Sequence, residues 1–242
     1  MSVAEKAELL RRLHHGPAIL VLPNAWDVAS AVVLAAVPGV RALATTSAGV
    51  ARSLGFEDGE QAPREEMVRM ASRIAAAVPI PVTADLEAGY GDPVGTALAA
   101  WVGGIAGINF EDSPGGSLRP VEEQASLIRE IRTASPELVL NARVDVFIRG
   151  VGDVDEAVKR GNAYLAAGAD CVYPIACPAD SIAELARRID GPVNILVATG
   201  GPHPSELAEL GVARVTWGSG LAGAAYAAAV SVATAALAPS GG

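Results

Sequence analysis

Cysteine and clustered positive charge are scarce in this sequence, and their scarcity excludes several classes of protein. Lys and Arg number 18 against 27 Asp and Glu in 242 residues, which gives a net charge of −9. No stretch concentrates the positive charge that a nucleic-acid backbone or an anionic membrane requires. The two cysteines, Cys171 and Cys177, match no zinc or redox spacing and are too few for a secreted disulfide scaffold. We therefore expect a cytoplasmic protein that binds a small molecule, with neither nucleic acid nor membrane as a partner.

Lysine and histidine are also rare, which limits the chemistry open to the chain. The lysines are Lys6, before the first predicted strand, and Lys159, in a predicted outer helix. A Schiff-base mechanism therefore lacks its amine. Of the three histidines, only His203 lies in a loop beside a predicted strand end, which argues against a histidine-ligated zinc site.

Long apolar runs are limited to the C-terminal segment, residues 220 to 238. This segment is mostly Ala and lacks an aromatic belt or flanking basic residues, so we do not expect it to span a membrane. Its small apolar residues lie nearly all round the predicted helix, more than one barrel face can bury. The segment therefore predicts a homo-oligomer.

Short β-rich runs alternate with helix-like segments along the chain. Gly or Pro precedes most of these runs, and the composition of 51% hydrophobic and 4% aromatic residues suits helix-on-strand packing of small side chains. Eight β-then-α units predict an α/β fold, a (β/α)8 TIM-type barrel formed by a single domain over residues 1–242. A doubly wound open sheet is the alternative. The predicted strands are residues 18 to 22, 41 to 47, 81 to 87, 105 to 111, 138 to 145, 170 to 174, 193 to 197 and 213 to 217.

Polar side chains share one face in three consecutive predicted strands. Alternate strand residues face the lumen of a barrel, and the active site forms at the carboxyl ends of its strands. The polar sets should therefore meet at one mouth of the barrel. They are Thr83, Asp85 and Glu87 in the third strand, Asn109 and Glu111 in the fourth, and Asn141, Arg143 and Asp145 in the fifth.

Acidic residues at a poorly solvated mouth repel each other by about 3 kcal/mol per pair at about 5 Å and an effective dielectric near 20. A set of oxygen donors such as Asp85, Glu87 and Glu111 suits Mg²⁺ or Mn²⁺. Asp85 and Glu87 could instead be solvated loop acids or helix caps. Arg143 could clamp an acidic substrate, form a structural ion pair with Asp145 or Glu111, or do both in different states.

After the second predicted strand, "TTSAGVARSLGFEDGE" supplies hydroxyl and backbone N–H groups of the kind that bind anions. An ordinary capped turn is the alternative. Six motifs in order then resemble the isocitrate lyase/phosphoenolpyruvate mutase superfamily over nearly all of the chain. They are "PNAWDVASA", "TSAGVARSLGFEDG", "ADLEAGYG", "GINFEDS", "NARVDVF" and "PVNIL".

This resemblance implies residue roles, a cofactor and an assembly. It implies Mg²⁺ or Mn²⁺ as cofactor, and dimers that exchange a C-terminal helix and pair into tetramers. It also implies that Arg143 binds the charged groups of the substrate. The implied metal site is Asp85, Glu87 and Glu111, with Asp58 in the water-mediated shell, and the implied substrate contacts are Ser47, Ala48, Gly49, Asp85 and Asn194.

The loop after the fourth predicted strand departs from the pattern that the resemblance implies. Lyases of that family carry a Lys-Lys-Cys-Gly-His type of loop there, whereas residues 112 to 121 contain no Cys, Lys or His. We therefore expect poor cleavage of isocitrate or methylisocitrate. The expected activity is a metal-dependent lyase reaction on a small 2-oxo acid through an enolate, by decarboxylation of an oxaloacetate-type substrate or by hydrolysis. Alternatives are C–P chemistry, of the phosphonopyruvate hydrolase or phosphoenolpyruvate mutase kind, and a non-catalytic 2-oxo-acid binder.

The expected catalytic residues follow from this reaction. Arg143 and Glu111 lie at the predicted mouth, and the enolate must be protonated by water or by a nearby group such as Tyr90 or Ser117.

Overall fold

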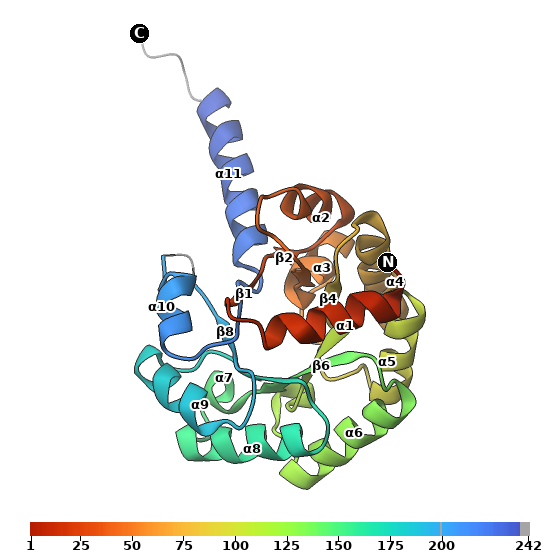
Figure 1. Cartoon of the computed structure of the whole chain (residues 1–242). Coiled ribbons are helices and arrows are strands. Elements are labelled where there is room, and N and C mark those ends of the chain that lie inside the picture. Colours follow the sequence, from red (N-terminus) through yellow and green to blue (C-terminus); the bar gives the residue numbers. More distant parts are fainter. Residues whose placement is uncertain (199, 238–242) are drawn as a thin grey trace.

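The computed structural model describes residues 1–198 and 200–237, which contain nine β-strands and eleven α-helices (Figure 1). The strands are β1 (Leu20–Leu22), β2 (Asn24–Ala25), β3 (Leu43–Thr45), β4 (Val82–Asp85), β5 (Gly107–Glu111), β6 (Val139–Val144), β7 (Cys171–Pro174), β8 (Asn194–Leu196) and β9 (Arg214–Thr216). The helices are α1 (Val3–His14), α2 (Val28–Ala35), α3 (Ser47–Leu54), α4 (Arg64–Ala77), α5 (Pro93–Val102), α6 (Val121–Ala134), α7 (Val146–Arg149), α8 (Val154–Ala166), α9 (Ile182–Arg188), α10 (Pro204–Glu209) and α11 (Gly220–Leu237), with 3₁₀ turns η1 (Pro114–Gly116) and η2 (Ala179–Ser181).

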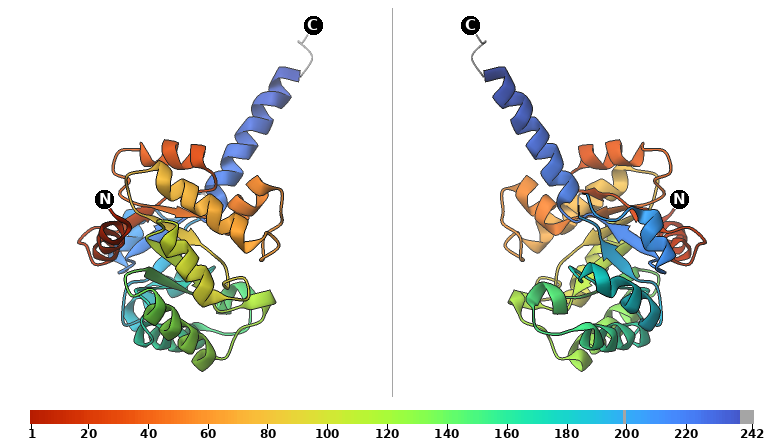
Figure 2. Two further views of the ribbon diagram at one scale, coloured as in Figure 1. Left: turned by 90° about the vertical axis from the view of Figure 1, so that its right-hand side faces the viewer. Right: turned by 90° about the vertical axis from the view of Figure 1, so that its left-hand side faces the viewer.

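All strand pairs are parallel, and the strands form two arcs. One arc has the order β2-β3-β4-β5-β6-β7, and the other has the order β1-β9-β8. Pro23 alone separates β1 from β2, and an isolated bridge between Val172 and Val193 joins β7 to the residue before β8. The longer arc follows the chain order, without the reversal at a switch point that marks a doubly wound sheet. With helices around the outside, the α/β TIM-type barrel is confirmed (Figures 1 and 2).

Every predicted strand is present, but each is shorter than predicted, and the first is followed by an extra strand. Pro23 has no N–H to donate, so the ladder changes partner there: β1 pairs with β9, whereas β2 pairs with β3. The second predicted strand ends early because Thr46 caps α3, where its hydroxyl accepts the N–H of Gly49. The third ends early because Glu87 adopts a positive φ of 51° in the following turn.

The helix α1 closes the amino-terminal end of the barrel, opposite the predicted site. Its buried Ala7, Leu10 and Leu13 pack in one cluster with residues near the beginnings of several strands, among them Leu20 and Val139. In Figure 1 this helix crosses the end of the barrel that faces the viewer. Polar residues at the carboxyl ends of the strands therefore lie at the other mouth.

Alternation along the strands separates the helix-facing core from the polar lumen, as predicted. Val82, Ala84 and Leu86 belong to the main hydrophobic core, and so do Ile108 and Phe110 of β5. Their sequence neighbours point the other way and form the site.

The final helix, α11, projects from the barrel and is almost entirely exposed (Figures 1 and 2). Of its 18 residues only Ala222 is buried, while Val230 and Val232 are 66% and 72% exposed. At its base, the Tyr226 ring packs against Trp26 with 6.2 Å between centroids. By length and composition alone, α11 is the one helix in the described ranges that could cross a membrane. Residue 238, which the prediction included in this helix, lies outside the described residues.

Candidate active site

The strand register places the predicted polar residues side by side at the carboxyl mouth. Asp85 is opposite Asn109, which in turn is opposite Asn141, and Glu111 is opposite Arg143. The amide of Asn141 donates to Asn109 Oδ1 at 2.8 Å. These neighbours lie on adjacent strands, so the rigid ladder rather than a loop fixes their positions.

Asp85, at the end of β4, has one fully engaged and one unpartnered carboxylate oxygen. Its Oδ2 accepts from the hydroxyl of Ser47 at 3.2 Å and from the Ser47 N–H at 3.5 Å. Its Oδ1 is buried and has no hydrogen-bond partner among the described residues. Burial raises the pKa of Asp85 against the opposing influence of the Arg143 cation, and the charge of Asp58 raises it further. The Arg143 cation and the two donors of Ser47 together stabilise this carboxylate.

The turn after β4 fixes Glu87 through Tyr90 and Glu60. Glu87 Oε1 accepts from the Tyr90 hydroxyl at 2.7 Å, and its Oε2 accepts from the Glu60 N–H at 2.7 Å. A side chain on Gly89 would place Cβ 2.6 Å from Pro93 Cα, so this tight turn requires glycine. Burial, with the charge of Asp85 adding to it, raises the pKa of Glu87 to about 7.

Arg143 is buried between two carboxylates at the end of β6. Its Nε and Nη2 donate to the two oxygens of Asp145 at 2.6 and 3.1 Å, and its Nη1 donates to Glu111 Oε1. Burial raises the pKa of Glu111, and the Arg143 cation opposes that rise. Both ion pairs considered for Arg143 from the sequence are therefore present, and they occupy all three of its donor nitrogens.

Two cavities open at this mouth. The inner cavity has a volume of about 240 Å³, and the outer cavity has a volume of about 340 Å³. The Glu111–Arg143 ion pair lies between them, because Arg143 lines the inner cavity and Glu111 lines the outer one. The inner cavity is lined by Ser47, Ala48, Asp58, Asp85, Arg143 and Tyr173, among others. The outer cavity is lined by Glu87, Glu111, Ser113, Gly115, Gly116 and Arg149, among others.

Four residues considered for the site lie outside both linings. The N–H of Gly49 donates to the capping Thr46 hydroxyl at 3.4 Å. Asn194 is fully buried and hydrogen-bonds Thr216 behind the inner cavity. The Tyr90 hydroxyl is committed to Glu87, and burial together with the Glu87 charge raises the pKa of Tyr90, so its hydroxyl stays protonated. Ser117 is exposed, beyond the part of the loop that lines the outer cavity.

The predicted metal ligands are close to the mouth but face separate partners. Among the described residues, no three His, Cys, Asp or Glu side chains stand together as a metal-binding group. Glu87 faces Tyr90 and Glu60, while Glu111 faces Arg143. The unpartnered Oδ1 of Asp85 nevertheless fits a cation, because a buried carboxylate oxygen left without a donor is costly. A donor set made only of oxygen matches Mg²⁺ or Mn²⁺.

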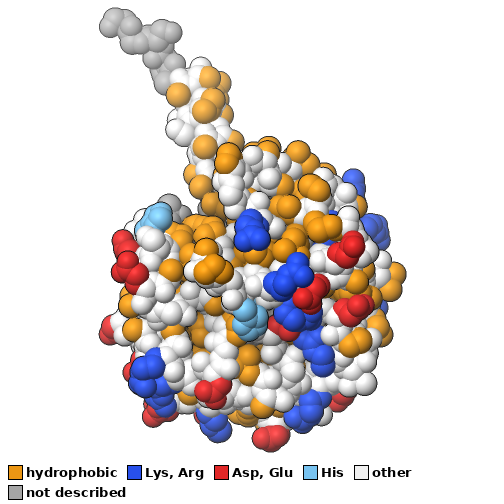
Figure 3. Space-filling view, in the orientation of Figure 1, with side chains coloured by type: hydrophobic (Ala, Val, Ile, Leu, Met, Phe, Trp, Pro, Cys, Tyr) orange, Lys and Arg blue, Asp and Glu red, His pale blue; other side chains and the backbone are white. Residues whose placement is uncertain are grey.

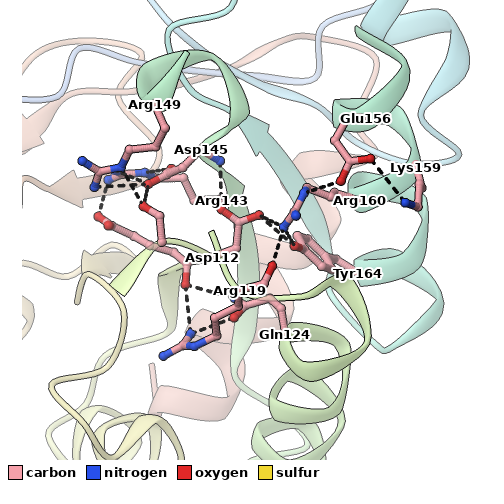
Figure 4. A network of polar contacts seen from close by, with 12 residues as sticks. Asp112, Arg119, Gln124, Arg143, Asp145, Arg149, Glu156, Lys159, Arg160 and Tyr164 are labelled. Carbon is pink, nitrogen blue, oxygen red and sulfur yellow. Dashed lines mark hydrogen bonds and ion pairs between the residues drawn. The ribbon is translucent and has the colours of Figure 1, made fainter. Parts of the chain in front are cut away.

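A buried network lies behind the site, drawn in Figure 4, and no sequence motif predicted it. Asp112 is fully buried; its Oδ2 accepts from the Tyr164 hydroxyl at 2.8 Å and from Arg160 at 3.0 Å. Its Oδ1 accepts the N–H of Asp145 at 2.9 Å, which supports the partner of Arg143. The signal available was the position of Asp112 directly after β5, but Arg160 and Tyr164 are 48 and 52 residues away in sequence.

The loop after β5 is closed at its base and joined to α7 at its beginning. The Arg119 N–H donates to the carbonyl of Asp112 at 2.8 Å, and the Arg119 guanidinium donates to Gln124 Oε1 at 2.7 Å. The Ser113 hydroxyl donates to Asp145 and accepts from Arg149 Nε at 3.0 Å. Ser113 and Arg149 therefore extend the polar lining of the outer cavity, and neither was singled out from the sequence.

A TIM-type barrel with acids, hydroxyls and arginines at the carboxyl ends of its strands has the arrangement of an enzyme for small acidic molecules. The family model for phosphoenolpyruvate phosphomutase matches residues 10–237. The chain belongs to the isocitrate lyase/phosphoenolpyruvate mutase superfamily, and the resemblance carried by its motifs is confirmed.

Relatives and solved structures agree with this placement. An uncharacterized protein of Mycobacterium tuberculosis is 42% identical over 225 residues, which cover 89% of this chain and 86% of that protein. The 2-methylisocitrate lyase of Bacillus subtilis is 31% identical over 205 residues, covering 79% of this chain and 67% of the lyase. A candidate phosphonomutase from Burkholderia cenocepacia has a TM-score of 0.88 at 38% identity, over 96% of this chain and 99% of that one. Oxaloacetate acetylhydrolase with its product oxalate has a TM-score of 0.85 at 25% identity, covering 95% and 85%.

Proposed function

We propose that this protein is a Mg²⁺- or Mn²⁺-dependent lyase-type enzyme that cleaves a C–C bond in a small 2-oxo acid through an enolate. The single observation that carries the proposal is the buried, unpartnered Oδ1 of Asp85, a residue that lines a cavity of about 240 Å³. Ser47 and Arg143 also line that cavity. A small acid and a divalent cation complement this combination in size and charge.

Relatives of known name support the same class of reaction. One relative is a 2-methylisocitrate lyase, and two structural neighbours are oxaloacetate acetylhydrolase and phosphonopyruvate hydrolase. The first two names describe C–C cleavage of a carboxylic acid, and the third describes hydrolysis of a phosphonate. The second candidate function, C–P cleavage, is favoured by the phosphonopyruvate hydrolase likeness, which has a TM-score of 0.85 at 25% identity.

The position of each residue at the mouth indicates whether it would bind the metal or the substrate. Asp85 would hold the metal directly, with Glu87, Glu111 and Asp58 around it, and the bound metal would supply a Lewis acid that stabilises the enolate. Ser47 and the neighbouring backbone at Ala48 line the inner cavity at the beginning of α3 and would bind the substrate carboxylate there, because the amino-terminal end of a helix favours an anion.

Arg143 and Tyr90 then have orienting roles. Arg143 would orient a charged group of the substrate and hold Glu111 in place. The Tyr90 hydroxyl orients Glu87, and its raised pKa makes it a poor acid, so water is the expected proton donor to the enolate.

A substrate comparison tests the proposal. Purified protein with Mg²⁺ should receive oxaloacetate, phosphonopyruvate and methylisocitrate, with kcat/KM measured for each and the metal's own decarboxylation of oxaloacetate subtracted. We expect the highest value for a 2-oxo acid, because residues 112 to 121 supply no Cys, Lys or His for proton transfer. Faster cleavage of methylisocitrate would refute the assignment. Binding of 2-oxo acids without turnover would indicate a binding protein.

The assembly proposed with this function is a homodimer or homotetramer in which α11 packs on a second copy. The exposed apolar side chains of α11 are accompanied by exposed Val32, Val33 and Val37 on and just after α2. Figure 3 shows hydrophobic side chains along α11 and over the surface at its base. An exposed apolar surface of this kind is costly in water, and a second copy of the chain would cover it.

A further inference from the structure

The outer cavity contains an arginine whose guanidinium is largely unengaged. Arg149 ends the short helix α7, its side chain is 34% exposed, and it lines the outer cavity. Within the described residues its one hydrogen bond runs from Nε to the Ser113 hydroxyl, at 3.0 Å. Its Nη2 forms a long ion pair with Asp145 Oδ2 at 3.9 Å, which is beyond hydrogen-bonding distance. Both terminal nitrogens can therefore donate to a ligand.

Arg143 is more heavily engaged than Arg149. All three of its nitrogens already donate to Asp145 or Glu111, so only the second hydrogen on each terminal nitrogen remains for a ligand. Arg143 and Arg149 are the two cationic residues that line the cavities in the described part of the chain. A divalent cation beside Asp85 would be largely neutralised by the surrounding acids, which leaves little positive charge for a second anionic group of the substrate. Arg149 can supply that positive charge.

The two guanidinium groups are close enough to act on one small molecule. Both approach the same atom, Asp145 Oδ2, at 3.1 Å for Arg143 and 3.9 Å for Arg149. Their Nη2 atoms therefore lie no further apart than the sum of those two distances. The loop opposite leaves room, because Gly115 and Gly116 carry no side chains, and a Cβ on Gly116 would lie 3.5 Å from Arg149 Nη1.

We propose that Arg149, oriented by Ser113, is a specificity residue that binds the distal acidic group of a dianionic 2-oxo acid. This inference rests on the proposed function and decides between two of its versions. A guanidinium stabilises a carboxylate and not neutral CO₂, so it opposes loss of the bound group by decarboxylation. It does not oppose cleavage in which that group is retained.

For an oxaloacetate-type substrate, the reaction that keeps the distal carboxylate is hydrolysis of the C2–C3 bond. Water forms a new bond to C2 and loses a proton, the C2–C3 bond breaks, and its electron pair passes to C3, which takes up a proton. The products are oxalate and acetate, and the distal carboxylate remains in acetate. Decarboxylation would instead break the C3–C4 bond and give pyruvate and CO₂.

The binding test compares a dianionic with a monoanionic 2-oxo acid. Calorimetry with Mn²⁺ would measure 2-oxoglutarate and pyruvate on the parent, on Arg149→Met and on Arg149→Lys. We expect Arg149→Met to weaken 2-oxoglutarate binding by about tenfold to a hundredfold, with pyruvate binding unchanged, and Arg149→Lys to restore part of the preference. Arg188→Met is the matched control, because Arg188 is 31% exposed and pairs with Glu184 and Asp155 on the outer surface.

Three outcomes would overturn the proposal, and they differ in what else they overturn. If Arg149→Met melts like the parent and binds 2-oxoglutarate and pyruvate with the parent's ratio of affinities, the role of Arg149 is refuted but the proposed function is not. Pyruvate as the main product from oxaloacetate, after correction for the metal background, would refute retention of the distal group. Failure of either acid to bind the parent would refute the proposed function as well.

Discussion

Replacing Arg143 by Lys should lower both the stability of the fold and the efficiency of the reaction. The Arg143 side chain is 10% exposed and donates to both oxygens of the fully buried Asp145 while also contacting Glu111. A lysine ammonium keeps the charge but cannot span these two carboxylates in the planar geometry of a guanidinium. The substitution therefore removes at least one buried, charge-assisted hydrogen bond, and each such bond contributes about 1.5–3 kcal/mol.

We expect the free energy of unfolding to fall by about 2 kcal/mol, which corresponds to a melting temperature lower by roughly 4–8 °C for a chain of this length. If substrate orientation depends on the same contacts, kcat/KM should fall by about 30-fold, the equivalent of about 2 kcal/mol. Urea unfolding followed by circular dichroism gives the first quantity. Initial rates per folded molecule, at saturating Mg²⁺, give the second.

Arg132→Lys is the control at the opposite end of the barrel. Arg132 donates to the Gly168 carbonyl at 2.8 Å and to Asp170 at 2.6 Å, so its replacement should cost similar stability without changing kcat/KM. Equal unfolding midpoints for Arg143→Lys and the parent would refute the calculated contribution of the ion pairs. Lower stability with unchanged kcat/KM would show that Arg143 is a purely structural ion pair.

Three further predictions concern Asp85, the cap of α3 and the final helix. Asp85→Asn should abolish Mn²⁺ binding in calorimetry and yet raise the melting temperature of the metal-free protein, because it removes a buried, incompletely partnered charge; undiminished binding would exclude Asp85 as a ligand. Gly49→Ala should destabilise the fold by about 1–3 kcal/mol in urea unfolding, because its Cβ would lie 2.5 Å from Thr46 Cγ2. Gly223→Ala, where a Cβ would meet open space in α11, should instead be neutral or stabilising by up to about 1 kcal/mol, and equal losses at both glycines would contradict the packing argument. Val230→Glu should convert the proposed oligomer to a monomer in light scattering at micromolar concentration, and a parent that is already monomeric would exclude the oligomer.

Strand parity predicted which residues meet at the mouth, because side chains alternate strictly along a strand. Asp85, Asn109, Asn141 and Arg143 fall on the lumen side for that reason, and parallel pairing in chain order then makes them neighbours. The sequence alone therefore predicted which backbone positions form the site.

The hydrogen-bond partners of these side chains could not be predicted from the sequence, because they depend on rotamers and on contacts with residues distant in the chain. Glu87 turns toward Tyr90, three residues later, because the positive φ at Glu87 directs the chain into a tight turn. Gly49 was expected to bind substrate, but its N–H is occupied by Thr46, one residue before the beginning of α3. Arg149 was not considered because α7 begins directly after Asp145, and nothing in the local pattern shows that its last turn faces a neighbouring loop.

A backbone hydrogen bond from Arg119 to Asp112 closes the loop between these residues at its base. The loop could therefore be replaced by another of different length or sequence. The groups that attach this loop to the barrel lie at its two ends: Glu111 belongs to β5, the Asp112 side chain is anchored to α8, and Leu118 packs against the main core. Doubling the length of a flexible loop costs only about 0.6 kcal/mol in closure entropy. A longer segment with its own proton donor could therefore be grafted between Ser113 and Leu118 without refolding the scaffold. New reactions can evolve on this barrel by changing a few surface residues while the interior stays as it is.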